Sequence, residues 1–217
     1  MTTTSQPRPS RGRRSTRPSG EDREQAILDT AERLLRDRPY ADISVDDLAK
    51  GAGISRPTFY FYFASKEAVL LALWESVIQE ADAALESLPV ARADDRHDIW
   101  RPAIKVFLDT FGNHQGVTVA ASGSDNSAVR SVFAKFMQKW IDFTAQTIEV
   151  ERRRGAAPIT LPAHDIATSL NLMNERTLLA AFAAETPGIP PDRVLDTLVH
   201  VWTCAVYGQY PQPSRSR

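Results

Sequence analysis

The sequence predicts an all-α protein, and three observations lead to that prediction. Apolar residues recur three or four positions apart in every long segment between residues 19 and 207. Ser19 and Ser44 each stand three residues before an aspartate, which is the spacing of a capping box at a helix start. No segment has the pattern of a β-strand. A chain of 217 residues is long enough to bury a substantial core around such helices.

The first 18 residues differ in composition from the rest of the chain. They are rich in Pro, Ser and Thr and contain five arginines and no acid, while the whole chain has a net charge of -1. Such a segment cannot bury apolar surface, so residues 1–18 are predicted to be a disordered basic arm. The arm is either an inert solvated tail or a cationic segment that follows DNA phosphates or a minor groove.

A three-helix head is predicted for residues 19–64. The first helix should run from Ser19 to Arg38 and stop at Pro39. The second should begin at the cap residue Ser44 and end at a turn that contains Gly51 and Gly53, since glycine readily adopts a left-handed backbone. Ser55 is the expected cap of the third helix, residues 56–63. This spacing is typical of a helix-turn-helix that reads DNA, although a packed helical hairpin without a ligand has the same pattern.

The third helix carries an unbroken row of aromatic residues from Phe59 to Phe63. A helix of two turns cannot bury them all on one side, so some must face solvent and form a binding surface. A dinucleotide-binding loop is excluded at Gly51-Ala52-Gly53, because Arg56 stands where the third glycine belongs and a helix precedes the turn. Hydroxyls, arginine and lysine can bind phosphates and base edges. The predicted DNA contacts are Ser44, Ser55, Arg56, Thr58, Phe59, Tyr60, Tyr62 and Lys66.

The remaining chain, residues 65–217, is predicted to form a helical body. The first body helix, residues 65–88, is long enough to reach from the head into the body and act as a lever. A loop is expected over residues 89–95 and a break between Gly112 and Gly116. The further predicted helical segments are residues 98–111, 117–122, 127–154, 163–185 and 191–207.

Two features of the body suggest a ligand pocket. Large aromatic residues cluster in several helices, and Asn171 and Asn174 lie three apart among apolar residues of one helix. An apolar cavity with a few polar groups is the usual form of a small-molecule site. The alternative is an ordinary core, because aromatic stripes at helical spacing usually only pack.

The head resembles the TetR family of bacterial repressors. That family has a Thr-x-Tyr-x-x-Phe run followed by Ser-Lys-Glu, and this chain has Thr58, Tyr60 and Phe63 followed by Ser65-Lys66-Glu67. Ala64 stands where the family often has proline. The resemblance implies a repressor of transcription that binds operator DNA.

The body is similar to one branch of that family, which represses a neighbouring flavin monooxygenase gene. The runs FMQKWI, RGAAP, LPAH, LNLMNERTL and RVLDTLVH carry this resemblance, and only Gly116 to Arg130 matches poorly. It implies about nine helices, a homodimer formed through the last two, and a mostly apolar tunnel for a small effector. The implied lining is Trp100, Ile104, Phe107, Phe111, Phe133, Met137, Trp140, Phe143, Asn171, Asn174 and Trp202.

Within that implied tunnel, Asn174 is the main hydrogen-bond donor to a ligand carbonyl and Asn171 a secondary one. Phe133 and Phe143 depart from the branch, where a tryptophan and a tyrosine are expected. The substitutions keep a ring at each position and lose a polar group. The ligand preference can therefore differ from that of the branch.

The sequence also argues against other classes of protein. Cys204 is the single cysteine, so we expect no disulfide and a reducing, cytoplasmic location. We expect no membrane span and no secretory signal. The four histidines have no metal-binding or catalytic spacing, so we expect no enzyme, metal or cofactor. The remaining rival is a helical carrier of apolar molecules that does not bind DNA.

Overall fold

The computed structural model describes residues 19–88 and 99–208, and over these residues the chain is helical with no strand. This confirms the all-α prediction. The helices are α1 (Gly20–Asp37), α2 (Val45–Gly51), α3 (Arg56–Tyr62), α4 (Lys66–Glu86), α5 (Arg101–Asn113), α6 (Gln115–Ser122), α7 (Ser127–Arg153), α8 (Ala163–Phe182) and α9 (Pro191–Tyr207), with a 3-10 turn η1 (Tyr40–Asp42) after α1. The predicted arm and the loop at 89–95 lie outside the described residues.

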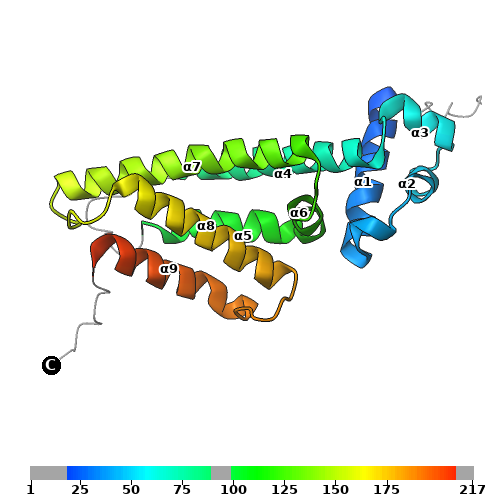
Figure 1. Ribbon diagram of the computed structural model, residues 1–217. Helices are drawn as coiled ribbons and strands as arrows, with labels where there is room; N and C mark the ends of the chain where they lie inside the picture. Colours follow the sequence, from blue (N-terminus) through cyan, green and yellow to red (C-terminus); the bar gives the residue numbers. More distant parts are fainter. Residues whose placement is uncertain (1–18, 89–98, 209–217) are drawn as a thin grey trace, which may run out of the picture.

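The molecule is elongated, with a small head of α1, α2 and α3 at one end and the body of α5 to α9 at the other (Figure 1). Both predicted capping boxes are present, at Ser19 with Asp22 and at Ser44 with Asp47. Gly53 has a φ of 68°, so the α2–α3 turn uses the left-handed backbone that the sequence predicted.

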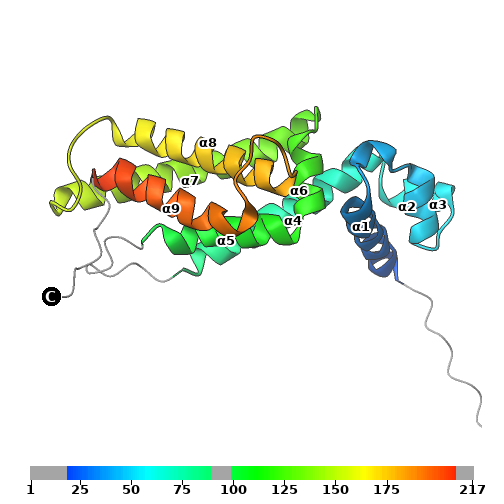
Figure 2. The same cartoon turned by 90° about the horizontal axis from the view of Figure 1, so that it is seen from below.

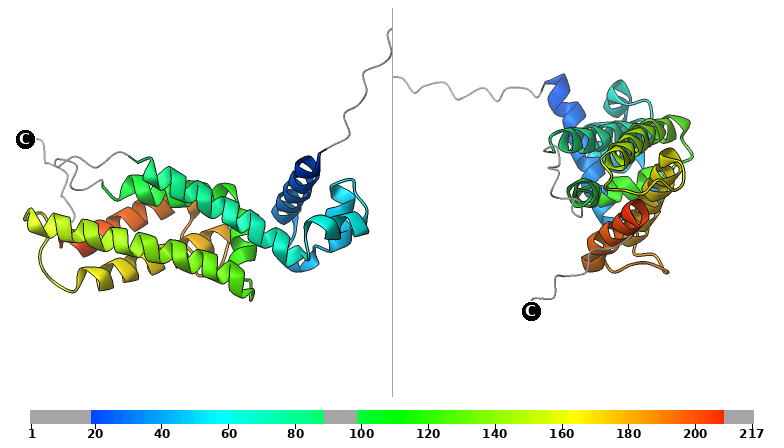
Figure 3. Two further views of the ribbon diagram at one scale, coloured as in Figure 1. Left: turned by 90° about the horizontal axis from the view of Figure 1, so that it is seen from above. Right: turned by 90° about the vertical axis from the view of Figure 1, so that its left-hand side faces the viewer.

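The long helix α4 connects the two ends. It leaves the head at Lys66 and runs beside α7 in the body (Figure 3). Its Asp82 accepts hydrogen bonds from Lys139 Nζ at 2.8 Å and Trp140 Nε1 at 2.9 Å, and Glu86 accepts from Lys139 at 2.7 Å. These contacts fasten the far end of the lever to α7.

The break in the helix that was predicted between Gly112 and Gly116 is shorter in the structure, and it lies where the body meets the head. Helix α5 continues through Gly112 to Asn113, and the chain breaks at His114. A Cβ added to Gly116, inside α6, would lie 2.3 Å from the backbone oxygen of Leu35 in α1. Gly116 therefore allows α6 to lie close to α1. It lies inside α6 and does not break that helix.

His114 adds polar contacts at the same junction. Its Nδ1 lies 2.7 Å from Glu32 of α1, and its Nε2 lies 3.1 Å from Glu80 of α4. The start of α6 thus contacts both the head and the lever.

Helices α8 and α9 lie side by side along one side of the body (Figure 2). The bounds of α9 agree with the prediction, whereas α8 ends at Phe182 and not at Glu185. Ala184 adopts a φ of 50°, and Glu185 N donates back to the carbonyl of Ala180 at 2.9 Å, which closes the helix end. No helix among the described residues is long and apolar enough to cross a membrane.

Candidate functional site

The aromatic row of α3 divides between core and solvent. Phe59 is 0% exposed and Phe63 7%, whereas Tyr60 is 46% and Phe61 83% exposed. Residues four apart share a helix face, so Phe59 and Phe63 turn inward together. The prediction that Phe59 contacts DNA is therefore wrong, because its ring packs in the core of the head. Phe61, absent from the predicted contacts, is the most exposed ring of the row.

Arg56 and Tyr60 form one arranged pair on the outer face of α3. Arg56 donates to Asp46 of α2 at 3.2 Å and to the Tyr60 hydroxyl at 3.3 Å, and its guanidinium lies 5.8 Å from the centre of the Tyr60 ring. Since the hydroxyl accepts this bond, its own proton remains able to donate to a phosphate. The ion pair with Asp46 holds Arg56 in place before any ligand binds.

The hydroxyl residues of the head act first as helix caps. Ser44 Oγ accepts from the Asp47 backbone N–H at 3.1 Å. The Ser44 hydroxyl and backbone N–H both donate to the Asp47 carboxylate, at 2.7 and 2.9 Å, and these two bonds lower the pKa of Asp47 to about 2. Ser55 Oγ caps α3 and lies 2.8 Å from the Thr58 hydroxyl. Both serines are exposed, so their predicted DNA contacts stay predictions. Tyr62 is half-buried on the same helix.

Lys66 has internal partners that the sequence did not indicate. Its Nζ donates to the carbonyls of Tyr40 at 3.2 Å and Ile43 at 3.0 Å, and it lies 4.4 Å from the centre of the Tyr40 ring. An ammonium has three N–H groups, so one remains for a phosphate. Lys66 therefore joins the lever helix to the head whether or not it also touches DNA.

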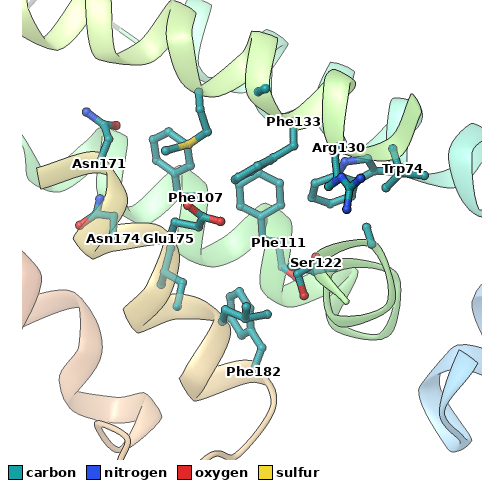
Figure 4. A pocket seen from close by; sticks show the side chains of 17 residues that line it. Trp74, Phe107, Phe111, Ser122, Arg130, Phe133, Asn171, Asn174, Glu175 and Phe182 are labelled. Atoms are coloured by element: carbon teal, nitrogen blue, oxygen red, sulfur yellow. The ribbon is translucent and has the colours of Figure 1, made fainter. Parts of the chain in front are cut away.

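The body contains a cavity of about 330 Å³ between α4, α5, α6, α7 and α8 (Figure 4). Its wall is mostly apolar and aromatic. It is lined by Trp74, Phe107, Phe111, Thr118, Ala121, Ser122, Val129, Arg130, Phe133, Ala134, Met137, Asn171, Asn174, Glu175, Leu178, Leu179 and Phe182. Six of the predicted residues are among them: Phe107, Phe111, Phe133, Met137, Asn171 and Asn174.

The other five predicted lining residues lie elsewhere. Phe143 is 55% exposed on α7, and Ile104 is 1% exposed in the core beyond the cavity. Trp140 is held by Asp82, and Trp100 packs against Trp202 with ring centres 5.2 Å apart. The cavity therefore lies nearer the head than the resemblance implied, and it ends before the layer formed by Trp100 and Trp202.

Asn174 has an unused hydrogen-bond donor at the cavity wall. Its Oδ1 accepts from Trp202 Nε1 at 2.8 Å, and an indole N–H only donates, which fixes the orientation of the amide. The Nδ2 group is buried and has no partner among the described residues. Leaving such a group unpaired costs about 1–3 kcal/mol, which a ligand acceptor would recover.

Asn171 differs from Asn174 in this respect. Its Nδ2 donates to Thr144 Oγ1 at 3.2 Å and to the Ala167 carbonyl at 2.9 Å. Both of its donors are therefore satisfied within the protein. The two asparagines look equivalent in sequence, but of the two only Asn174 has an amide nitrogen without a partner in the described part of the chain.

The sequence missed several lining residues that have polar or aromatic side chains. Trp74 and Phe182 were not among the candidates, nor were the two charged residues Arg130 and Glu175. Glu175 could have been found, because it follows Asn171 by four positions and so lies on the same helical stripe. The structure shows no cluster of metal-binding side chains among the described residues.

Comparison with known proteins gives matches over the head and the body. Residues 27–73 match the model described as bacterial regulatory proteins of the tetR family, and residues 100–208 match the C-terminal domain of the transcriptional regulator EthR. The chain is 62% identical over 202 residues to the HTH-type transcriptional regulator EthR of Mycobacterium tuberculosis H37Rv, covering 92% of this chain and 94% of that protein. It is 55% identical to EthR of Mycolicibacterium smegmatis, covering 97% and 98%.

The fold also matches solved structures. A TetR-family transcriptional regulator from Rhodococcus sp. aligns with a TM-score of 0.67 at 18% identity, covering 84% of this chain and 99% of that one. At this identity the match concerns the fold alone.

Proposed function

The chain belongs to the TetR family of bacterial transcriptional regulators, in its EthR group, and from this premise we propose that it is a dimeric repressor released from its operator by a small apolar effector. Membership of a DNA-binding family decides against an enzyme and against a carrier that does not bind DNA. The proposal concerns the effector, the dimer, the contact residues and the target gene.

The observation that carries the effector proposal is the buried N–H of Asn174. Asn174 lines an apolar cavity, its Nδ2 has no partner within the part of the chain that the structure describes, and its amide is oriented by Trp202. An apolar molecule with a carbonyl oxygen would fill the cavity and pair with this donor. The proposed effector is therefore an apolar ester, ketone or amide.

The walls of the cavity support a route from effector to DNA. Trp74 belongs to the lever helix α4, and Thr118 belongs to α6, whose Gly116 packs closely on α1. A ligand that pushes on these helices would move the head. It would release DNA only to the extent that it binds the moved state more tightly than the DNA-competent state.

A dimer through α8 and α9 would place two α3 helices on one face of DNA. Membership of the TetR family supports a dimer, and Leu172 of α8 is 50% exposed. Two recognition helices fit successive major grooves when their centres are about 34 Å apart, or a multiple of that distance. By analogy with the EthR group, the proposed target is an adjacent flavin monooxygenase gene. We propose that residues 19–64 form the DNA-binding domain and that residues 65–217 form the domain for effector binding and dimerisation.

The test is a gel shift with DNA from upstream of the protein's own gene and its divergent neighbour, with a scrambled duplex as control. A specific shift that apolar ketones or esters reverse is the expected result. A specific shift that no member of such a series reverses would contradict the effector proposal and leave DNA binding intact.

The Asn174→Ala variant sharpens this test. It should raise the ketone concentration needed for release by about tenfold, because one hydrogen bond to the ligand is lost. Asn171→Ala is the matched control and should change it less, since its donors are already paired inside the protein. Equal effects of the two substitutions would remove Asn174 as the anchor.

A further inference from the structure

The lining of the cavity includes one acidic side chain, Glu175. It lines the cavity from α8, directly after Asn174, and has no hydrogen-bond or ion-pair partner among the described residues. Burial raises the pKa of this carboxyl above its ordinary value, and no neighbouring charge opposes the shift. In Figure 4 the carboxylate lies between the Asn174 amide and the Phe111 ring.

The basic residue of the cavity does not serve as its partner. Arg130 comes from the first turn of α7, and its guanidinium forms an ion pair with Asp125 at 3.5 Å. The wall near Glu175 is otherwise formed by the rings of Phe107 and Phe111 and by apolar residues of α8. A carboxylate in such surroundings gains from any cation or N–H group brought to it, and it repels a second anion.

We propose that Glu175 determines the ligand class of this cavity by selecting apolar molecules that carry a protonated amine and rejecting those that carry a carboxylate. This proposal rests on the proposed function, because it assumes that the cavity binds an effector. It adds a cationic group to a ligand otherwise defined by an apolar body and an acceptor for Asn174. Two neighbouring residues of α8 would then recognise the two polar features of one ligand.

The physical reason is a difference in pairing. A protonated amine supplies a positive charge to pair with the Glu175 carboxylate, whereas a carboxylate ligand places two like charges next to each other in a partly enclosed space. Opposite charges attract and like charges repel more strongly at a partly desolvated site than in water, so a preference of at least about tenfold is expected.

The experiment uses three probes of equal chain length: 1-octylamine, 2-octanone and octanoate. Binding to the full-length protein is measured by tryptophan fluorescence, to which Trp74 at the cavity wall contributes, and by the shift in melting temperature. The expected order of affinity is amine first, ketone second and octanoate last. In Glu175→Gln the amine should lose its advantage over the ketone, and octanoate should bind more tightly than it does to the wild type.

Two controls keep the result specific. Glu75→Gln, an exposed position on α4, should leave the order unchanged. Arg130→Gln should leave the amine preference intact. If octanoate binds best and loses that advantage in Arg130→Gln, then Arg130 sets the ligand class and the inference is overturned.

The binding of 2-octanone tests the effector cavity independently of the role of Glu175. If the ketone binds and the amine binds no better, the role of Glu175 is refuted while the effector cavity stands. If none of the three probes binds, both the effector cavity and the role of Glu175 are refuted.

Discussion

The head and the body each present aromatic rings, but they assemble them differently. In the head, the exposed rings of Tyr60 and Phe61 are neighbours on one short helix. In the body, the rings around the cavity are Trp74, Phe107, Phe111, Phe133 and Phe182, from α4, α5, α7 and α8. A local helix is enough to place the first set, whereas the second exists only when the helices pack together. Substitutions should therefore act locally in the head and through helix packing in the body.

The largest effect should come from the inward side of the aromatic row. Phe59→Ala should destabilise the protein by about 3–5 kcal/mol, because it removes a fully buried ring. Phe61→Ala, two positions on, should change stability by less than about 0.5 kcal/mol, because the ring is exposed. Denaturant unfolding measures both, and similar losses in the two variants would mean that the row does not divide as described.

The next effect tests the contact between body and head. Gly116→Ala should cost about 1–3 kcal/mol, because the new Cβ would meet the Leu35 carbonyl and force α6 away from α1. In a helix without such a contact, replacing glycine by alanine would stabilise the protein, because alanine has the higher helix propensity. The control is Gly123→Ala, whose added Cβ would have no neighbour closer than 3.6 Å. Thermal unfolding compares the two, and a gain in stability in Gly116→Ala would disprove the close contact.

The outer face of α3 should affect DNA binding with little effect on stability. Tyr60→Ala should weaken operator binding by about tenfold, because it removes a hydroxyl able to bind phosphate and a partner of Arg56. Lys66→Ala should weaken DNA binding and also lower the melting temperature, since it removes two hydrogen bonds to carbonyls. Operator titration with a parallel melting curve separates the two variants. Unchanged operator affinity in Tyr60→Ala would remove that side chain from the interface.

The smallest effect on the folded protein should come from the arm. Between residues 19 and 64 acidic residues outnumber basic ones, so the arm is the strongest local source of positive charge. Deleting residues 1–18 should leave the melting temperature unchanged and make operator binding less dependent on salt, since each neutralised phosphate contributes about 0.9 to the log–log slope. An identical slope for the full and shortened chains would mean that the arm does not touch DNA.

Much of this arrangement was predictable because it depends on nearby residues. The caps at Ser19, Ser44 and Ser55, the turn at Gly53 and the bounds of α9 all follow from local signals. The sequence also indicated that the α3 row must split, because five neighbouring rings cannot share one face of a helix. It did not indicate which rings turn inward, since that depends on how α3 packs against α2 and the rest of the core.

The cavity was predicted less well. Asn171 and Asn174 were both singled out, but only the packing of α8 against α7 and α9 pairs one with Thr144 and leaves the other an unused N–H. Trp100 and Trp202 were expected at the wall and instead pack against each other beyond it. The positions of these side chains depend on contacts between segments that are far apart in the sequence. The periodicity of apolar residues within one helix carries no information about such contacts.

The sequence by itself determined the helices, their caps and the family resemblance, because hydrogen bonding within a helix and the spacing of apolar residues are local properties. Only the tertiary structure decided where the cavity ends, why Gly116 must be glycine, and which polar groups face the cavity without a partner. A cavity is the space that several helices fail to fill, so its shape depends on their relative positions. Those positions are fixed by contacts between side chains far apart in the chain, such as Trp202 with Asn174 and Gly116 with Leu35.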